Sequence, residues 1–373
     1  MPGGVGGDRS GNLTAPIPIL LGGIRNPGKL VECGSLPPLW ASPTLCDSVA
    51  NGGSRGALRV SSVPAMLSYQ HEFHAGNVAD VHKHLLLWLV LDALLARSKP
   101  FVVLDLFAGA GQYQLDAGAA RRSGEWRHGI GRLWHLAGGP PSLRAYLDAL
   151  RALQQGPAAE PSWYPGSPQL VRSRLRAQDR LIACELHPAA HAALQTDLRS
   201  DPRCHVHRRD AREAARALFP PEPRRGLALL DPAYERSAEY DETAEIAAEI
   251  RRRWNTGILM IWYPILAEGR HAALRDRLLA AHAGERILFS ELRLSQPVRG
   301  PGLQGSGMAV LGAPWQLDRQ ARQTLFAAWQ CLDPDRAGGL FQALALENQV
   351  GRPQFHRVES SEPPETLDVK DHD

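Results

Sequence analysis

The sequence predicts an α/β fold in which a mainly parallel sheet of seven strands is covered by helices on both faces. Apolar runs of strand length alternate with segments of helical periodicity, which is the pattern of a doubly wound sheet. The chain has 373 residues, 44% of them hydrophobic, which is enough for a sizeable core. One gap between strand-like runs is too long for a simple crossover and predicts an inserted helical subdomain.

Seven apolar runs bounded by turn residues are the predicted strands. They span 101–107, 181–185, 205–209, 227–231, 258–263, 286–294 and 308–311. Segments with helical periodicity lie before, between and after these runs. They span 78–97, 189–199, 238–254, 267–282 and 318–331. Together these elements place the folded domain at 66–334.

The segment 112–165 is the predicted helical insertion, because it contains an amphipathic stretch at 143–154. Residues 1–65 are rich in Gly, Pro and Ser, so we expect a disordered extension or a start codon assigned too early. Residues 335–373 form a C-terminal segment. It ends in a run with six acidic residues after position 356, expected to be a disordered tail.

Composition narrows the class of protein. The five cysteines are scattered without a C-x-x-C pair, which argues against a disulfide scaffold and favours a reducing cytoplasm. No apolar run is long enough to span a membrane, and no secretory signal is evident at the start. A net charge of +3 permits a nucleic-acid partner without demanding one. We expect a soluble, cytoplasmic protein; a monomer is favoured, and no protein partner is indicated.

The first predicted strand runs into a glycine turn, Ala108-Gly109-Ala110-Gly111. Such a turn lets the backbone approach a nucleotide-like ligand at the carboxyl end of the sheet. The third glycine of the dinucleotide fingerprint is absent, because Tyr113 and Gln114 follow instead, and this disfavours NAD. An ordinary strand-to-helix turn is the alternative explanation.

Acidic residues follow three successive predicted strands. Glu185 ends the second strand, where a bound ribose would present its hydroxyls, and no other partner for its carboxylate is evident. Asp210, directly before Ala211, follows the third strand and could accept a hydrogen bond from an adenine amino group. Asp231 ends the fourth strand. Chance can explain any one of these positions, but the series points to a nucleoside site.

The fourth strand leads into Asp231-Pro232-Ala233-Tyr234, which resembles the D-P-P-Y signature of enzymes that methylate amino nitrogens of bases. An exocyclic amine has its lone pair delocalised into the ring, so it attacks a methyl group only when drawn towards tetrahedral geometry. The Asp231 carboxylate and the Pro232 carbonyl can accept the two N–H bonds, and the Tyr234 ring can stack on an extruded base. A plain turn after a buried strand is the alternative.

The segment 71–84 is unusually rich in histidine. His and Asp are good metal ligands, but no separate motif completes a site, so no metal is expected. We favour a loop and helix start that closes over the cofactor or contacts RNA phosphates through Lys83.

Several motifs occur together in this chain. They are Met66-Leu67-Ser68-Tyr69 with an H-x-x-F-H-A-G-N-x-A-D-V-x-K-H run, D-x-x-A-G-A-G-x-Y-Q-L, Tyr164-Pro165-Gly166-Ser167-Pro168, Glu185-Leu186-His187-Pro188 and Asp231-Pro232-Ala233-Tyr234. In combination the chain resembles the ribosomal RNA large subunit methyltransferase J family, the 23S rRNA adenine-N6 methyltransferases. The resemblance covers roughly 66–334. It implies a Rossmann-like class I methyltransferase fold, S-adenosylmethionine as the cofactor and 23S ribosomal RNA as the partner.

The resemblance also implies residue roles. The residues implied to contact S-adenosylmethionine are His84, Phe107, Ser167, Glu185, Asp210, Ala211 and Asp231. Asp231 would also be the catalytic acceptor, and Tyr69 would touch the substrate adenosine. Phe107 stands where relatives can carry histidine, so its contact would use the backbone or the ring face. Ala233 replaces the usual second proline, which loosens the loop but keeps both hydrogen-bond acceptors.

Two other functions remain open at this point. Asp-Pro-x-Tyr also serves enzymes that methylate adenine N6 or cytosine N4 in DNA, although no target-recognition domain is evident. A non-catalytic RNA-binding protein could keep the methyltransferase fold, but intact Asp231 and Tyr234 argue against it.

Overall fold

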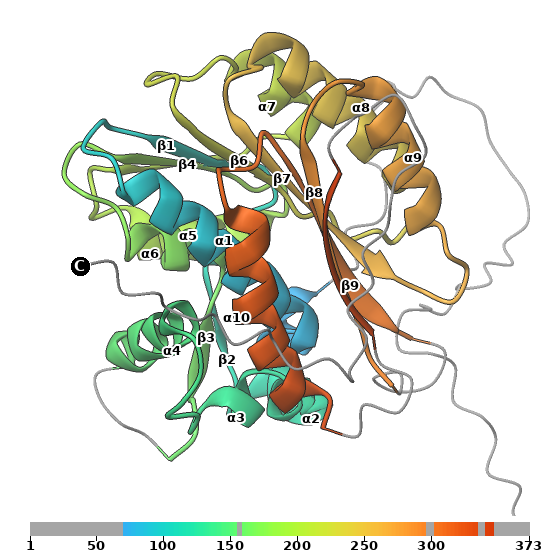
Figure 1. Ribbon diagram of the computed structural model, residues 1–373. Helices are drawn as coiled ribbons and strands as arrows, with labels where there is room; N and C mark the ends of the chain where they lie inside the picture. The colour runs from blue at the N-terminus through green and yellow to red at the C-terminus, as the bar shows by residue number, and fades with distance from the viewer. Residues whose placement is uncertain (1–69, 155–158, 296–301, 335–339, 347–373) are drawn as a thin grey trace, which may run out of the picture. The chain divides into compact units, whose positions relative to one another are not determined.

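The computed structural model describes residues 70–154, 159–295, 302–334 and 340–346, which form an α/β fold (Figure 1). Their main sheet has eight strands in the order β10-β8-β9-β7-β6-β1-β4-β5. Tyr69, and the expectations for 1–65 and for the acidic tail, lie outside the described residues. None of the helices within them is long and apolar enough to cross a lipid bilayer.

Every predicted strand is present in the sheet. The seven are β1 (Val102–Asp105), β4 (Arg180–Cys184), β5 (Cys204–His207), β6 (Gly226–Leu230), β7 (Ile258–Ile265), β8 (Ile287–Arg293) and β9 (Gly305–Leu311). Neighbours in the series β5-β4-β1-β6-β7 are parallel, while β9 pairs antiparallel with β7 and β8. The predicted fold class is therefore confirmed. An eighth strand that was not predicted, β10 (Leu340–Leu346), pairs antiparallel with β8.

Helices cover both faces of the sheet, as Figure 1 shows. One layer holds α1 (Val78–Leu95), α5 (Ser167–Arg172), α6 (Pro188–Leu198) and α10 (Leu317–Leu332), and the other holds α7 (Ala211–Ala217), α8 (Ala238–Arg253) and α9 (His271–Ala281). Successive side chains of a strand point to opposite faces. Accordingly Val103 packs in the first layer, while Val102 and Leu104 pack in the second. The strands are continuous apolar runs because both of their faces are covered.

The segment 112–165 begins and ends with a pair of short antiparallel strands. Its elements are β2 (Gln112–Gln114), α2 (Gly118–Ser123), η2 (Glu125–Arg127), α3 (Ile130–Leu133), α4 (Pro141–Leu153) and β3 (Trp163–Pro165). Gln112 pairs with Pro165, so the two ends of the insertion lie together. The 3₁₀ turn η1 (His71–Phe73) precedes α1 and packs against α2.

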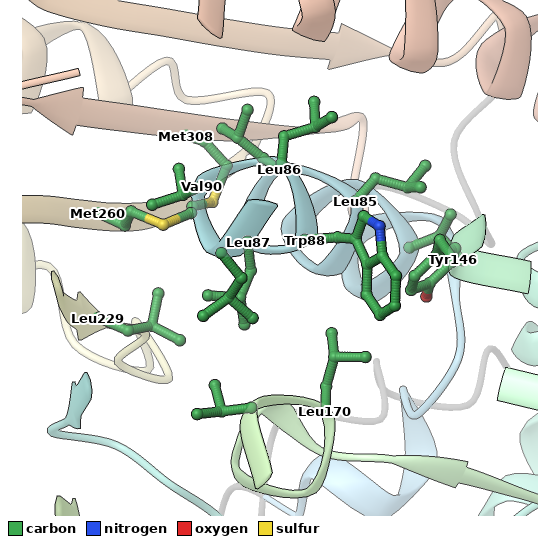
Figure 2. Packing of buried hydrophobic residues seen from close by; sticks show 14 of the residues in the cluster. Leu85, Leu86, Leu87, Trp88, Val90, Tyr146, Leu170, Leu229, Met260 and Met308 are labelled. Carbon is green, nitrogen blue, oxygen red and sulfur yellow. The ribbon is translucent and has the colours of Figure 1, made fainter. Parts of the chain in front are cut away.

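Helix α1 is buried on nearly all sides. Its first turn is capped by Asn77, whose side-chain oxygen accepts hydrogen bonds from the amides of Ala79 and Asp80 at 2.9 and 3.1 Å. Trp88 meets Tyr146 of α4 edge-on, with ring centroids 5.9 Å apart. Figure 2 shows apolar side chains of the helix itself, namely Leu85, Leu86, Leu87 and Val90. Around them lie Leu170, Leu229, Met260 and Met308 from other elements. A helix that is apolar all round belongs in a core.

A histidine in this buried helix ties α1 to the antiparallel end of the sheet. The ring nitrogens of His82 lie 2.9 Å from the hydroxyls of Ser306 and Ser290, and Trp262 donates its indole N–H to Ser306 at 3.0 Å. Burial lowers the pKa of His82 to about 3, so the ring is neutral at neutral pH.

We expect His82→Ala to destabilise the protein more at pH 7.5 than at pH 5.0. The substitution leaves two buried hydroxyls without their ring partner, at a cost of about 1 to 3 kcal/mol each. Unfolding restores the ordinary pKa of about 6.5, so the stabilisation from His82 is fully present above pH 6.5 and is lost as the pH falls towards 3.

Urea unfolding at both pH values measures this difference. The exposed His135 supplies the control, because His135→Ala should change the free energy of unfolding little at either pH. Equal destabilisation by His82→Ala at pH 7.5 and 5.0 would contradict a neutral buried ring.

Candidate active site at the carboxyl edge of the sheet

The carboxyl ends of β1, β4 and β6 meet at one edge of the sheet. Asp105 pairs with Ala183 of β4 and with Leu229 of β6, so the residues that follow these strands emerge side by side. From β1 the chain proceeds to β4 and β5 on one side and later to β6 and β7 on the other. Ligands of such sheets bind where the strand order reverses, which here is between the carboxyl ends of β1 and β6.

The glycine turn after β1 has the backbone shape that the sequence suggested. Gly109 and Gly111 have φ of 65° and 86°, in the left-handed region that favours glycine. A Cβ on Gly109 would lie 2.3 Å from the hydroxyl of Tyr113, so a larger residue would displace that ring. The same hydroxyl accepts a hydrogen bond from the Ala110 amide at 3.0 Å. Tyr113, which the dinucleotide fingerprint does not contain, thus stabilises the glycine turn through its hydroxyl.

Glu185 lies at the tip of β4 and binds this turn. Its carboxylate accepts hydrogen bonds from the Gly109 amide at 2.8 Å and from the His187 amide at 2.6 Å. The expectation that Glu185 has no other partner is therefore wrong. Any ribose contact would share a carboxylate that already fastens the glycine turn to the start of α6.

Asp231, directly after β6, is held by a buried lysine. Lys83 of α1 donates to Asp231 Oδ2 at 2.5 Å and lies 2.8 Å from Asp80 Oδ1. Burial would lower the pKa of Lys83, but the carboxylates of Asp231 and Asp80 outweigh it and hold the pKa well above its usual range. Within the described part of the chain, Asp231 Oδ1 accepts no hydrogen bond. That oxygen is the free acceptor of the cluster.

The position of Lys83 corrects one expectation. A contact with RNA phosphates requires an ammonium at the surface, but Lys83 is 4% exposed and is engaged by two carboxylates. Asp80 is in turn bound by the Gly76 amide at 2.9 Å and by His71 Nε2 at 3.0 Å. Lys83 thus serves to place Asp231, not to meet RNA.

Asp105, at the end of β1, is another buried acid at this edge of the sheet. Asp105 Oδ2 accepts a hydrogen bond from Ser167 at 2.6 Å, and Oδ1 accepts one from the Phe107 amide at 3.2 Å. Burial raises the pKa of Asp105 to about 7, although the bond from Ser167 opposes the rise. Neither Asp105 nor Asp80 was a candidate from sequence. Asp105 stands in the quoted D-x-x-A-G-A-G motif at the end of an apolar strand, which was the available signal.

His84 joins α1 to the insertion. Its ring stacks on Tyr164 with an interplanar angle of 10°, and its Nδ1 lies 3.0 Å from the Tyr164 hydroxyl. That hydroxyl lies 2.6 Å from the hydroxyl of Tyr146. Burial lowers the pKa of His84 to about 3, so the ring is neutral. His84 thus links α1 to β3 as an uncharged imidazole.

The remaining predicted contacts are spread along the same edge. Asp210 is exposed and caps α7, accepting from the amides of Arg212 and Glu213, while Ala211 is buried as the first residue of that helix. Phe107 is half-buried in the loop after β1. The structure thus brings Ser167 to the end of β1, where Phe107 also lies. Asp210 and Ala211 follow β5, which is separated from β1 by β4.

Tyr234 does not present an open ring face. It is 7% exposed, its hydroxyl donates to the Trp262 carbonyl at 2.8 Å, and its ring packs 4.5 Å from that of Tyr240. Its φ of 53° is unusual for a residue with a side chain. In this conformation Tyr234 packs into the protein interior and stabilises the loop after β6.

The histidines of the segment 71–84 make bonds within the protein. His74 Nδ1 lies 2.9 Å from Glu125 of η2, and the other three contact Asp80, the two serines and Tyr164 as described above. In the ranges that the structure describes, no group of three or more His, Cys, Asp or Glu is arranged to hold a metal ion.

Comparison with known proteins identifies relatives of this arrangement. A family model described as "Ribosomal RNA large subunit methyltransferase D, RlmJ" matches residues 98–340. The chain is 39% identical over 261 residues to Ribosomal RNA large subunit methyltransferase J of Escherichia coli, covering 70% of this chain and 92% of that protein. It is 36% identical over 273 residues to the protein of that name in Haemophilus influenzae, covering 73% and 96%.

A solved structure shares the fold. The crystal structure of a protein from Legionella pneumophila superposes with a TM-score of 0.67 at 27% identity, covering 73% of this chain and 98% of that one. The family model matches well over half of the chain, and the two curated relatives are each covered almost completely. The chain therefore belongs to the ribosomal RNA large subunit methyltransferase J family.

Proposed function

We propose that this protein transfers a methyl group from S-adenosylmethionine to the N6 amine of an adenine in large-subunit ribosomal RNA. The observation that carries the proposal is the Asp231 carboxylate, which lies at the end of β6 with one oxygen fixed by Lys83 and the other free to accept. The names of the relatives, which are ribosomal RNA methyltransferases, favour RNA as the substrate.

The residues at this edge of the sheet fit S-adenosylmethionine. The glycine turn directly follows β1 at the carboxyl edge, where the backbone of an α/β fold can approach a nucleotide-like ligand. Glu185 would hold the ribose, and Ser167 and His84 would contribute to the same cofactor site. Lys83 lies between two carboxylates, so the cluster keeps a net negative charge that suits a cationic sulfonium. When bound, the cofactor supplies an electrophilic methyl group.

Asp231 would prepare the amine for attack. Its free Oδ1 would accept one N–H of the exocyclic amine, and the Pro232 carbonyl would accept the other, which draws the nitrogen towards tetrahedral geometry and withdraws its lone pair from the ring π system. The cation of Lys83 keeps Asp231 from turning towards other donors. Ala233 alters neither acceptor. The chemistry that the motif requires is therefore retained.

Tyr234 has a supporting part in this proposal. Its ring is packed against Tyr240 and its hydroxyl binds the Trp262 carbonyl, so stacking on an extruded base would require the loop after β6 to move. The position of Asp231 depends on that loop. Tyr234 thus contributes to the proposed reaction by holding the loop that carries Asp231 in place.

Incubation with labelled S-adenosylmethionine tests the substrate. Unmodified large-subunit RNA, small-subunit RNA and duplex DNA would be offered separately, and label is expected in the large-subunit RNA, at N6 of adenine. Label in DNA alone would show a DNA methyltransferase. Absence of label from every substrate would favour a binding protein without catalysis.

Asp231→Asn should lower the single-turnover rate of methylation about 100-fold or more, the range for loss of a positioned proton acceptor. RNA affinity should change little, because the carboxylate acts on the amine and not on the backbone. Asp241→Asn, an exposed acid on α8 that pairs with Arg277, is the matched control. A rate close to that of the parent protein would remove Asp231 from the mechanism.

Glu185→Ala should weaken binding of S-adenosylmethionine by about 1.5 to 3 kcal/mol, the usual effect of losing a charged hydrogen-bonding partner. Glu185→Gln should weaken it less, because the amide oxygen can still accept from the Gly109 amide. Calorimetric titration gives both dissociation constants. Glu213→Ala, on the exposed start of α7, is the control, and an unchanged constant for Glu185→Ala would place the ribose elsewhere.

A further inference from the structure

Three exposed arginines lie close together along the insertion and have no part in the reaction itself. Arg121 and Arg122 lie in the last turn of α2, and Arg127 ends η2. We call these three the insertion arginines. Arg132 is also exposed, but its guanidinium binds the Leu332 carbonyl at the end of α10 and is therefore structural.

The insertion arginines differ from those of α8 and α9 in their ion pairs. Within the described residues, none of the three forms an ion pair with a carboxylate. On α8 and α9, by contrast, Arg252 and Arg253 both pair with Glu249, and Arg277 pairs with Asp241. The α8 and α9 surface is locally compensated in charge. The three arginines of α2 and η2 have no such partner among the described residues, so their charges are available to an anion.

Two of these guanidinium groups are held on aromatic rings. Arg127 lies over the Trp126 ring at 4.7 Å from its centroid, and Arg122 lies over the Phe73 ring at 5.6 Å. A stacked guanidinium keeps its N–H donors available at its edge. Stacking therefore presents the donors to an anion with little loss of side-chain freedom on binding.

The insertion is hydrogen-bonded to η1, and η1 is connected to Asp231 through a series of side-chain contacts. The Ala119 amide of α2 donates to Glu72 at 3.0 Å, and the Ser123 hydroxyl donates to the Phe73 carbonyl at 2.5 Å. From η1, His71 contacts Asp80, whose Lys83 partner binds Asp231. The insertion also leaves the sheet at the glycine turn, so its base stands at the carboxyl edge.

Another basic cluster lies at the opposite edge of the sheet and has a structural use. Arg176 donates to the carbonyls of Arg97 and Lys99, and Arg225 donates to those of Leu94 and Lys99. These bonds satisfy carbonyls at and beyond the end of α1. The cluster is also on the side of the sheet away from Asp231, so it is the weaker candidate for a substrate contact.

We propose that the insertion arginines bind phosphates of the RNA that flanks the target adenosine. The proposal rests on the proposed function, because it takes RNA as the substrate. An extruded base must be held while its backbone stays anchored nearby. Exposed guanidinium groups without ion pairs, on an insertion whose base lies at the carboxyl edge of the sheet, fit that anchoring role.

The test replaces all three insertion arginines by glutamine and measures binding of in vitro transcribed large-subunit RNA over a series of salt concentrations. For every phosphate that the variant no longer neutralises, the slope of log Kd against log salt should fall by about 0.7 to 0.9, and the affinity at about 150 mM salt should fall roughly tenfold or more. Replacement by lysine keeps the charge and should retain most of the affinity. Binding of S-adenosylmethionine should be unchanged in both variants.

The control removes the same charge from the compensated surface, by R252Q, R253Q and R277Q together. This control should leave both Kd and the salt slope close to those of the parent protein. If the insertion variant and the control lose affinity equally, only net charge matters and the proposal is overturned. An unchanged slope in the insertion variant also overturns it.

The experiments distinguish a failure of the RNA surface from a failure of the proposed function. If the parent protein binds RNA through these arginines but transfers no methyl group to it, the proposed activity fails and the RNA surface stands. If the parent methylates RNA and the glutamine variant binds RNA as well as before, the activity stands and the surface fails.

Discussion

The burial of the Lys83 charge is the constraint on which the active-site end of this fold depends. Moving an ammonium from water into a protein interior costs several kcal/mol unless opposite charges compensate it. Here compensation requires Asp80 from the same helix and Asp231 from the end of β6. Helix α1 can therefore take only a position in which its first turns face the carboxyl edge of the sheet. The apolar remainder of the helix then fills the space between the sheet, α4 and α5.

The strands could be predicted from the sequence because each is an apolar run bounded by turn residues. A run such as 227–230 is buried on both faces and has few alternatives to a central strand. The eighth strand, β10, has the sequence Leu-Phe-Gln-Ala-Leu-Ala-Leu, whose alanines and leucines favour helix as readily as strand. Only its pairing with β8 makes it a strand. The helices α5 and α7, of six and seven residues, are too short to show a period.

The site could be predicted as far as topology determines it. Parallel strands bring their carboxyl ends to one edge, so Glu185 and Asp231 could be placed near the glycine turn without coordinates. The sequence could not show which polar groups are already paired. Lysine is usually exposed, and nothing local reveals that Lys83 is buried against Asp231, 148 positions away. The bonds of Glu185 to two backbone amides, and of Tyr234 to Trp262, likewise depend on the assembled fold.

The insertion departs from the sheet and returns to it at a single point. Gln112 pairs with Pro165, and the Gly166 amide donates to the Gly111 carbonyl at 2.7 Å. The two-stranded base of the insertion therefore joins its two ends. The order of the strands in the main sheet does not depend on the residues between those ends. A module attached in this way can grow, shrink or be exchanged during evolution while the catalytic edge stays in register. The insertion and the edge of the sheet that carries Asp231 can thus diversify at different rates.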